Sequence, residues 1–227
     1  MKKKPDEELV ERAIKLYAGV IYDTLDFDLH VKNSFMIDIS VKPSWGFKDV
    51  VFGPAFTCKG EKVQDPSHID DTVRLRMFQA FYEGCVQVIS SGGFREVAQF
   101  GDISGKIARK FGAVGAVVDA PTRDVKLIEE DGFHLFSAGV QSTDAYGKWQ
   151  ITEYEVPITM PGIHGTVTIN PGDYIFGDPD GVLVIPEDLV EQVIDGAEKR
   201  LERENKVREE IYNTDDILEL NNRVGRW

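Results

Sequence analysis

Cysteine and histidine, two side chains that commonly bind zinc, are scarce in this sequence. Its 227 residues include two cysteines and four histidines, and none of them stands at the short spacings typical of a zinc site. A disulfide between Cys58 and Cys85 would need an oxidising compartment, and nothing else in the sequence points to one. We therefore expect two buried free thiols in a fold held together by its hydrophobic core.

The sequence also lacks a long apolar run and an excess of basic residues. No stretch approaches the roughly 20 apolar residues of a membrane span. No apolar segment follows the three lysines of residues 1–5, as it would in a secretory signal. The formal net charge of -13 repels phosphate backbones. These absences predict a cytoplasmic protein that binds neither membranes nor nucleic acid.

The spacing of apolar residues in the first half of the chain predicts alternating helices and strands. Helices are indicated by steps of three and four residues, and buried strands by short β-branched runs. The predicted helices cover residues 6–23, 72–82, 101–111 and 125–130, and the predicted strands cover 50–57, 85–90, 113–119 and 135–137. Gly53-Pro54 is expected to form a turn through which the first of these strands is entered. This alternation is typical of an α/β fold.

The second half of the chain has a different pattern. After Gly139, short strand-like segments alternate with proline–glycine turns, which favours antiparallel sheet. These segments are residues 151–158, 166–169, 174–176 and 182–185. A terminal helix is predicted over residues 186–212, with one apolar and one charged face. No repeat or linker interrupts the chain, so we expect one domain over residues 1–227, with its core at about 50–210.

Two short segments are the candidates for chemistry. Gly101-Asp102-Ile103-Ser104-Gly105 opens a predicted helix, where free backbone N–H groups and the helix dipole favour a bound anion. Arg123-Asp124 follows a predicted strand, and ligand sites collect in such loops. Arginine can bind a carboxylate, and aspartate is a hard oxygen ligand for Mg²⁺ or Mn²⁺. Taken alone, Asp102 is explained equally well as the N-cap of the helix, with no role in binding. Arg123-Asp124 taken alone is explained by an ordinary surface ion pair or turn.

The combination of motifs is more specific than either segment. Asp102 and Arg123-Asp124 together form a D-x20-R-D pattern. The accompanying motifs are Gly53-Pro54-Ala55 with Thr57, residues 112–119, Phe136 with Ala138-Gly139, Val156-Pro157-Ile158, Pro171-Gly172-Asp173, and residues 177–182 followed by Ile185-Pro186. In order and spacing this series resembles the RraA-like family, which comprises regulators of ribonuclease activity A and 4-hydroxy-4-methyl-2-oxoglutarate aldolases. The resemblance covers roughly residues 50 to 210.

The resemblance implies a fold, an assembly and an activity. The fold is an α/β structure, a swivelling β/β/α sandwich with terminal helices, and family members assemble into homotrimers or stacked hexamers. The activity is that of a divalent-metal-dependent (class II) pyruvate aldolase, a lyase. Such an enzyme cleaves a 4-hydroxy-2-oxo acid, such as 4-hydroxy-4-methyl-2-oxoglutarate, through a pyruvate enolate. Because oxaloacetate gives the same enolate when it loses CO₂, oxaloacetate decarboxylation is expected as a side activity.

The resemblance also implies roles for individual residues. Asp124 is the expected ligand of Mg²⁺ or Mn²⁺, and Asp102 orients a water molecule on the metal. The pyruvyl carboxylate is held by Arg123 and by the backbone around Gly101, Ile103 and Ser104. Arg123 also stabilises the enolate, so Arg123 and Asp102 are the expected catalytic residues. Glu204 of a neighbouring subunit is a candidate to complete the site, although a solvated position in the charge run of residues 202–210 is an alternative.

Two other functions remain open at this point. The acidic chain could bind a basic segment of another protein, as the ribonuclease regulators of this family do by binding a ribonuclease. It could also act as a lyase on a different hydroxy acid. The second alternative is suggested by departures from the family pattern near the expected pocket, at Ile103-Ser104-Gly105, at Ala120-Pro121 and in residues 61–70.

Overall fold

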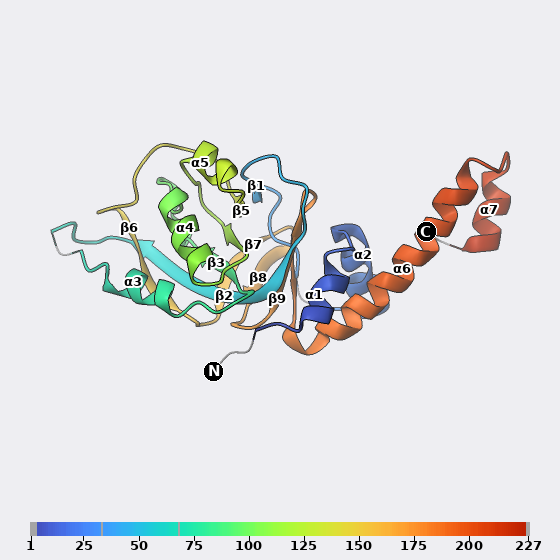
Figure 1. The fold of residues 1–227 in the computed structure, drawn as a ribbon, viewed down its shortest axis with the longest axis horizontal. Helices are drawn as coiled ribbons and strands as arrows, with labels where there is room; N and C mark the ends of the chain where they lie inside the picture. The colour runs from blue at the N-terminus through green and yellow to red at the C-terminus, as the bar shows by residue number, and fades with distance from the viewer. Residues whose placement is uncertain (1–3, 33, 68, 226–227) are drawn as a thin grey trace.

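The computed structural model describes residues 4–32, 34–67 and 69–225. It is a mixed α/β structure in which one large sheet is covered by helices and by a two-stranded hairpin (Figure 1). The helices are α1 (Glu7–Ala13), α2 (Ala18–Asp23), α3 (Thr72–Gln79), α4 (Asp102–Lys110), α5 (Val125–Glu130), α6 (Val190–Ile211) and α7 (Ile217–Val224). The strands are β1 (Lys42–Pro43), β2 (Val51–Lys62), β3 (Val86–Ser90), β4 (Gly115–Val118), β5 (His134–Ser137), β6 (Trp149–Tyr154), β7 (Ile158–Gly162), β8 (Gly165–Ile169), β9 (Tyr174–Asp178) and β10 (Gly181–Ile185).

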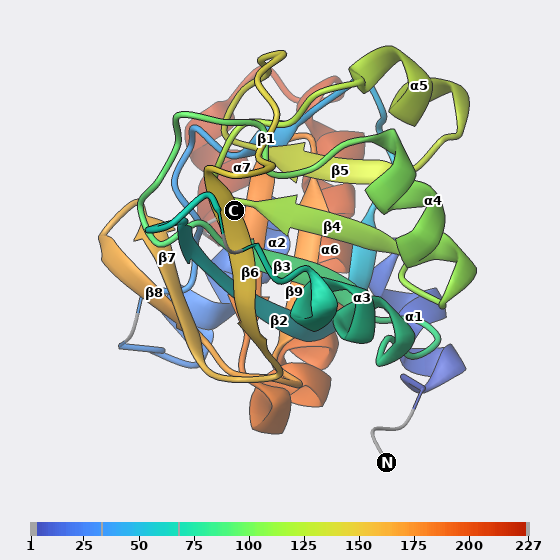
Figure 2. The same ribbon diagram turned by 90° about the vertical axis from the view of Figure 1, so that its left-hand side faces the viewer.

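Four neighbouring strands of the large sheet are parallel (Figure 2). The order along the sheet is β1-β5-β4-β3-β2-β9-β10, and β6 pairs with β2 outside this path. The pairs β2–β3, β3–β4 and β4–β5 are parallel, whereas β6, β9 and β10 join in antiparallel pairs. Strands β7 and β8 form a separate antiparallel hairpin. The antiparallel second half is therefore confirmed, and the carboxyl ends of β3, β4 and β5 meet at one edge of the sheet.

The buried side chains form three clusters, and a different set of helices or strands packs over each of them. Helices α3, α4 and α5 pack on the parallel strands over a cluster that includes Phe56 and Met77. The β7–β8 hairpin covers a second cluster around Phe136 and Met160. Helices α1, α2 and α6 pack on β9 and β10 around residues such as Ile194. The sheet is thus buried over most of its length, which explains its nearly continuous apolar strands.

The predicted strand over residues 151–158 is two strands, β6 and β7, and strand β2 is divided in the prediction where it should not be. It runs without a turn from Val51 to Lys62, so the turn expected at Gly53-Pro54 is wrong. Gly53 is needed for a different reason: a Cβ atom on it would lie 2.1 Å from the carbonyl oxygen of Gly84. Glycine serves here as the residue that lets two backbone segments approach each other.

We expect Gly53→Ala to destabilise the protein by about 2–3 kcal/mol, because a methyl group against a backbone carbonyl can be relieved only by moving β2 or residue 84. Urea denaturation would measure the change. Gly46→Ala is the matched control, since a Cβ on Gly46 meets nothing within 4 Å. Equal unfolding midpoints for the two variants would show that the contact around Gly53 is not tight.

The N-terminal helix predicted over residues 6–23 is two helices. Helix α1 ends at Ala13, Tyr17 is extended (φ -137°, ψ 161°), and α2 begins at Ala18. The buried Asp178 carboxylate accepts a hydrogen bond from the Ala18 N–H at 2.7 Å. This tertiary contact gives α2 its own beginning. The apolar periodicity does not reveal the break, because both helices pack against α6.

The C-terminal region begins as predicted and then contains an additional helix. A 3-10 turn at Glu187–Leu189 precedes α6, which ends at Ile211, close to the predicted boundary of 212. Helix α7 was not predicted. It is capped by the Asp216 carboxylate and folds back against α6 through Leu220, which is fully buried. Figure 1 shows α6 and α7 projecting as an arm from the body of the protein.

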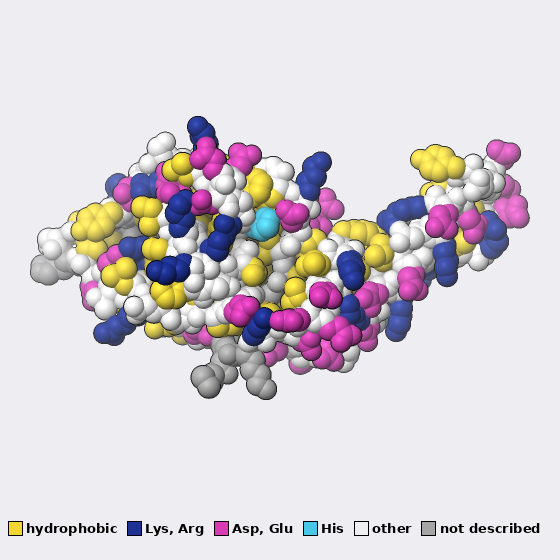
Figure 3. Space-filling model, viewed as in Figure 1, with side chains coloured by type: hydrophobic (Ala, Val, Ile, Leu, Met, Phe, Trp, Pro, Cys, Tyr) yellow, Lys and Arg dark blue, Asp and Glu magenta, His cyan; other side chains and the backbone are white. Residues whose placement is uncertain are grey.

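Some expectations from composition can be compared with this structure. Cys58 and Cys85 are buried and are not joined by a disulfide, as predicted, and burial raises the pKa of the Cys58 thiol. Within the described ranges, no helix has the length and apolar character needed to cross a membrane. Acidic side chains gather over α1 and the beginning of α6 (Figure 3).

Candidate active site

The loops that leave β3, β4 and β5 are joined to one another at the carboxyl edge of the parallel strands. The Arg123 N–H donates to the carbonyl of Phe100 at 3.0 Å, and the Thr122 N–H donates to the carbonyl of Gly139 at 2.9 Å. The hydroxyl of the fully buried Thr122 also donates to the carbonyl of Phe100, at 2.9 Å. These bonds hold three loops from distant parts of the sequence in one rigid arrangement. Such an edge is a common place for ligand sites in α/β proteins.

A pocket of about 360 Å³ opens at this edge. All the residues that the sequence nominates around the D-x20-R-D pattern line it: Gly101, Asp102, Ile103, Ser104, Arg123 and Asp124. The pocket is large enough for a small organic acid, because ligand pockets generally start at about 300 Å³. The structure therefore brings these residues together, and their chemical roles stay predictions.

Gly101 and Asp124 fit closely against each other. Asp124 is the N-cap of α5 and has a left-handed backbone conformation (φ 61°, ψ 28°). A Cβ atom on Gly101, the N-cap of α4, would lie 2.7 Å from the Asp124 carboxylate. Left-handed conformations are unfavourable for a residue other than glycine and concentrate at functional sites. The backbone at Asp124 therefore holds its carboxylate over the beginning of α4.

Arg123 lies between two carboxylates. Its Nε atom is 3.4 Å from Asp124 Oδ2, and its Nη1 atom is 3.3 Å from Asp144 Oδ2. The pKa of Asp144 is lowered, first by a hydrogen bond from the Tyr146 N–H and further by the charge of Arg123. Asp144 is thus ionised at neutral pH. The two carboxylates restrict the guanidinium group of Arg123 at the wall of the pocket.

Asp102, Ile103 and Ser104 form the first turn of α4. The Asp102 side chain is 17% exposed, with its Oδ2 atom 3.7 Å from Lys106 Nζ. Lys106 also pairs with Asp131 outside the pocket. Backbone N–H groups in a first helical turn have no partner within the helix. Ile103 is 67% exposed, so an apolar side chain stands beside these donors at the mouth of the pocket.

Three charged residues of this pocket are not predicted from the sequence: Asp71, Arg74 and Asp144. Asp71 and Arg74 belong to the beginning of α3, where Asp71 accepts hydrogen bonds from Arg74 Nε at 2.6 Å and from Arg74 Nη2. The pKa of Arg74 is raised by this pair and also by the charge of Asp144. Asp71 and Arg74 follow residues 61–70, the segment that departs from the family pattern. Only the tertiary fold shows that they reach the pocket.

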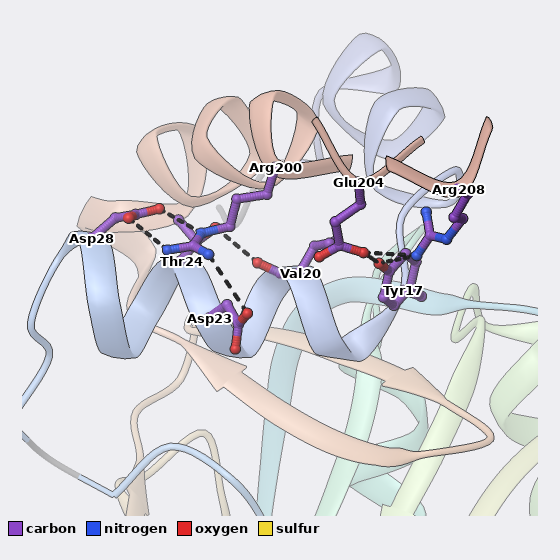
Figure 4. Close-up of polar contacts among 8 residues, drawn as sticks. All are labelled: Tyr17, Val20, Asp23, Thr24, Asp28, Arg200, Glu204 and Arg208. Carbon is purple, nitrogen blue, oxygen red and sulfur yellow. Dashed lines mark hydrogen bonds and ion pairs between the residues drawn. The ribbon is translucent and has the colours of Figure 1, made fainter. Parts of the chain in front are cut away.

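Glu204 lies elsewhere in the chain. It is on α6, where its Oε2 atom accepts hydrogen bonds from the Tyr17 hydroxyl and, at 2.7 Å, from Arg208 Nη2 (Figure 4). It does not line the pocket of its own chain. Its contribution to a neighbouring copy therefore stays a prediction.

Asp119, at the end of β4, is only 2% exposed, and its Oδ1 atom accepts a hydrogen bond from the Ser91 N–H at 2.6 Å. Burial raises the pKa of this carboxyl above its ordinary value, although the Ser91 N–H opposes the shift. The folded state therefore binds the proton more tightly than the unfolded state does. Consequently, ionisation of Asp119 lowers stability as the pH rises from the unfolded-state pKa through the folded-state pKa.

The variant Asp119→Asn keeps an acceptor oxygen and removes the charge. Relative to the wild type, its free energy of unfolding should increase as the pH rises above about 4, where an unfolded aspartate ionises. Urea titrations at several pH values would measure this difference, with the exposed Asp215→Asn as control. A difference that stays constant or falls with rising pH would contradict the assigned direction.

The donor set of the pocket fits a hard divalent cation that keeps most of its ligands as water or substrate. No group of three or more His, Cys, Asp or Glu side chains suited to a metal ion occurs in the described part of the chain. Mg²⁺, however, is commonly bound by one or two carboxylates together with oxygens of a ligand. The lining includes four carboxylates and two guanidinium groups, a formal charge of -2. One divalent cation beside Asp124 would balance that charge.

Comparison with known proteins places the chain in a class and then in a family. The fold is the RraA-like α/β fold. The structure of Streptomyces coelicolor RraAS2 superposes on this chain with a TM-score of 0.76 at 23% identity, over 92% of this chain and 99% of that chain. RraAS2 is described as an unusual member of the RNase ES inhibitor RraA protein family. The family model Aldolase/RraA matches residues 20–184. The chain therefore belongs to the RraA-like family.

Two curated relatives extend this comparison. A protein of Halalkalibacterium halodurans with the provisional name 4-hydroxy-4-methyl-2-oxoglutarate aldolase is 34% identical over 175 residues, 76% of each chain. Protein DlpA of Legionella pneumophila is 30% identical over 164 residues, which are 69% of this chain. The match spans only 24% of DlpA, so most of DlpA has no counterpart here.

Proposed function

We propose that this protein is a divalent-metal-dependent pyruvate aldolase that cleaves a 4-hydroxy-2-oxo acid. The observation that carries the proposal is the arrangement of Arg123 and Asp124 against the beginning of α4, in a pocket with room for a small acid. The provisional aldolase name of the H. halodurans relative supports the same activity. An anion-binding helix terminus, an arginine and a hard oxygen ligand are the groups that enolate chemistry requires.

The pyruvyl carboxylate would bind at the first turn of α4. The N–H groups of Ile103 and Ser104 lie there, and the positive end of the helix dipole favours an anion. Gly101 leaves space at this point that a larger residue would remove. Arg123 would lie beside the 2-oxo group, where its donors match an oxygen that becomes negative during the reaction.

Asp124 would hold Mg²⁺ or Mn²⁺ beside the substrate. The bound cation would supply Lewis-acid polarisation of the 2-oxo oxygen. Because the Asp124 carboxylate is confined between Gly101 and Arg123, it can present an oxygen to a cation without first reorganising.

In the proposed reaction, the proton of the C4 hydroxyl passes to a water molecule that Asp102 orients. The C3–C4 bond then breaks, C4 becomes a carbonyl, and the bonding electrons form the enolate of pyruvate at C2 and C3. Arg123 stabilises the enolate oxygen, and protonation at C3 gives pyruvate. Oxaloacetate would reach the same enolate by losing CO₂, so its decarboxylation is expected as a side activity.

Pyruvate release tests this proposal. Purified protein would be given 4-hydroxy-4-methyl-2-oxoglutarate, other 4-hydroxy-2-oxo acids, or oxaloacetate, with Mg²⁺ or Mn²⁺ and then with a chelator. We expect turnover that the chelator abolishes. Turnover that persists after complete metal removal would contradict the metal-dependent mechanism.

A ribonuclease-binding regulator is the second candidate, because the RraAS2 structure is described as belonging to a family of RNase inhibitors. Absence of turnover on every substrate would favour it. We also propose a homotrimer or hexamer, in which Glu204 of a neighbouring copy could approach the pocket after leaving Tyr17 and Arg208. Sedimentation together with Glu204→Gln kinetics would test that assembly.

A further inference from the structure

We infer that the part of the substrate beyond C4 is uncharged and hydroxylated. The preferred substrate would then be a polyhydroxylated 2-oxo acid with one carboxylate, instead of a dicarboxylate such as 4-hydroxy-4-methyl-2-oxoglutarate. This inference rests on the proposed function and specifies the substrate class of the same pocket. It follows from the charged residues of the pocket that the proposed reaction does not use: Asp71, Arg74 and Asp144.

The two arginines that line the pocket offer no unbalanced positive charge to a second carboxylate. Asp71 binds Arg74 through two of its donor groups, and Asp144 lies 3.3 Å from Arg123. Asp144 is also close enough to Arg74 to raise its pKa. Each arginine therefore already has a carboxylate beside it. With one divalent cation the lining is neutral, and the substrate carboxylate at α4 already makes the site negative. A second carboxylate would add a further negative charge and would face Asp71 and Asp144.

The same residues suit hydroxyl groups. The pair with Asp71 uses Arg74 Nε and Nη2, which leaves the two N–H donors of Nη1 outside it. Asp144 accepts from the Tyr146 N–H at 3.1 Å through Oδ1, and an ionised carboxylate has several acceptor positions. A hydroxyl can donate to Asp144 or Asp71 and accept from Arg74 at the same time. Alternating donors and acceptors thus match a chain of hydroxyl groups without adding charge.

An apolar tail fits this wall less well. Burying Asp71, Arg74 and Asp144 under a hydrocarbon group would remove water from three charges without replacing its hydrogen bonds. The carbon skeleton of the tail can contact apolar lining residues such as Tyr146, which is 72% exposed. A hydroxylated tail can therefore contact the apolar residues through its carbon atoms and the charged residues through its hydroxyl groups.

The test compares two substrates that release pyruvate by the same step. One is 4,5,6-trihydroxy-2-oxohexanoate, supplied as both C4 epimers, and the other is 4-hydroxy-4-methyl-2-oxoglutarate. We expect kcat/KM to be at least about tenfold higher for the better trihydroxy epimer. Asp71→Asn should shift the ratio of the two kcat/KM values about tenfold toward the dicarboxylate, because it leaves Arg74 with an unbalanced positive charge. Asp144→Asn should shift the ratio in the same direction.

The ratio of the two kcat/KM values is measured on one preparation of each variant. A partial loss of folded protein lowers both values equally and leaves the ratio unchanged. Glu153→Gln is the control: Glu153 pairs with Lys59 at 3.0 Å outside the pocket, and its ratio should equal that of the wild type. Preference of the wild type for the dicarboxylate, or no shift in either pocket variant, would overturn the inference while the proposed aldolase stands. If neither compound releases pyruvate and the protein does not exchange the methyl protons of pyruvate itself, the proposed function fails and this inference fails with it.

Discussion

Replacing Arg123 with lysine is expected to lower kcat/KM for pyruvate release by about 10²–10³-fold, the usual cost of losing one donor to a developing oxyanion. Lysine keeps the positive charge but not the planar fork of donors, and its ammonium group cannot contact Asp124 and Asp144 in the same way. The loss should appear mainly in kcat, because the interaction strengthens as the enolate forms. Steady-state kinetics on one substrate would measure it.

Arg76→Lys is the control for this prediction. Arg76 lies on α3, is exposed and does not line the pocket, so its kinetics should match those of the wild type. A wild-type kcat for Arg123→Lys would mean that positive charge alone is sufficient at this position. The proposed role of the guanidinium group would then be wrong.

Gly101→Ala is expected to lower kcat/KM by about 100-fold while leaving stability almost unchanged. The new Cβ would lie 2.7 Å from the Asp124 carboxylate, and a side-chain displacement of about 1 Å can cost this much in rate. The fold should accept alanine, because Gly101 has an extended backbone (φ -152°, ψ -179°) that any residue can adopt. Kinetics and urea denaturation of the same preparation would separate the two effects.

Gly46→Ala again serves as control, since it adds a methyl group where nothing lies within 4 Å. If Gly101→Ala lost activity and stability together, the glycine would have a general packing role. If it kept full activity, the position of the Asp124 carboxylate would not limit the reaction. The prediction requires loss of activity in a protein that unfolds at the wild-type midpoint.

The regular elements of this fold could be predicted because local sequence determines them. The alternation in the first half and the proline–glycine turns of the second half are short-range patterns, and β3, β4, β8 and β10 lie within about two residues of their predicted positions. The errors arise where a distant contact decides. Asp178 gives α2 its beginning, and the carbonyl of Gly84 explains Gly53 inside β2; neither partner is a neighbour in sequence.

The candidate site was predictable to a similar extent. Asp102 and Arg123-Asp124 could be nominated because a glycine-flanked helix start and a loop after a strand are local signals. The structure places them in one pocket, and their roles remain predictions. Arg74 and Asp144 could not be nominated, because an i,i+3 ion pair and a loop aspartate look like ordinary surface residues until the fold brings α3 and the loop after β5 to the same pocket.

The most direct test of the central claim is exchange of the methyl protons of pyruvate in D₂O, followed by NMR with magnesium and then with a chelator. This measurement detects the enolate alone and does not depend on the tail of the substrate. We predict magnesium-dependent exchange by the wild type and by Glu153→Gln, and exchange at the background rate for Asp124→Ala. Absence of exchange by the wild type, or equal exchange by folded Asp124→Ala, would contradict a pyruvate enolate formed beside a metal held by Asp124.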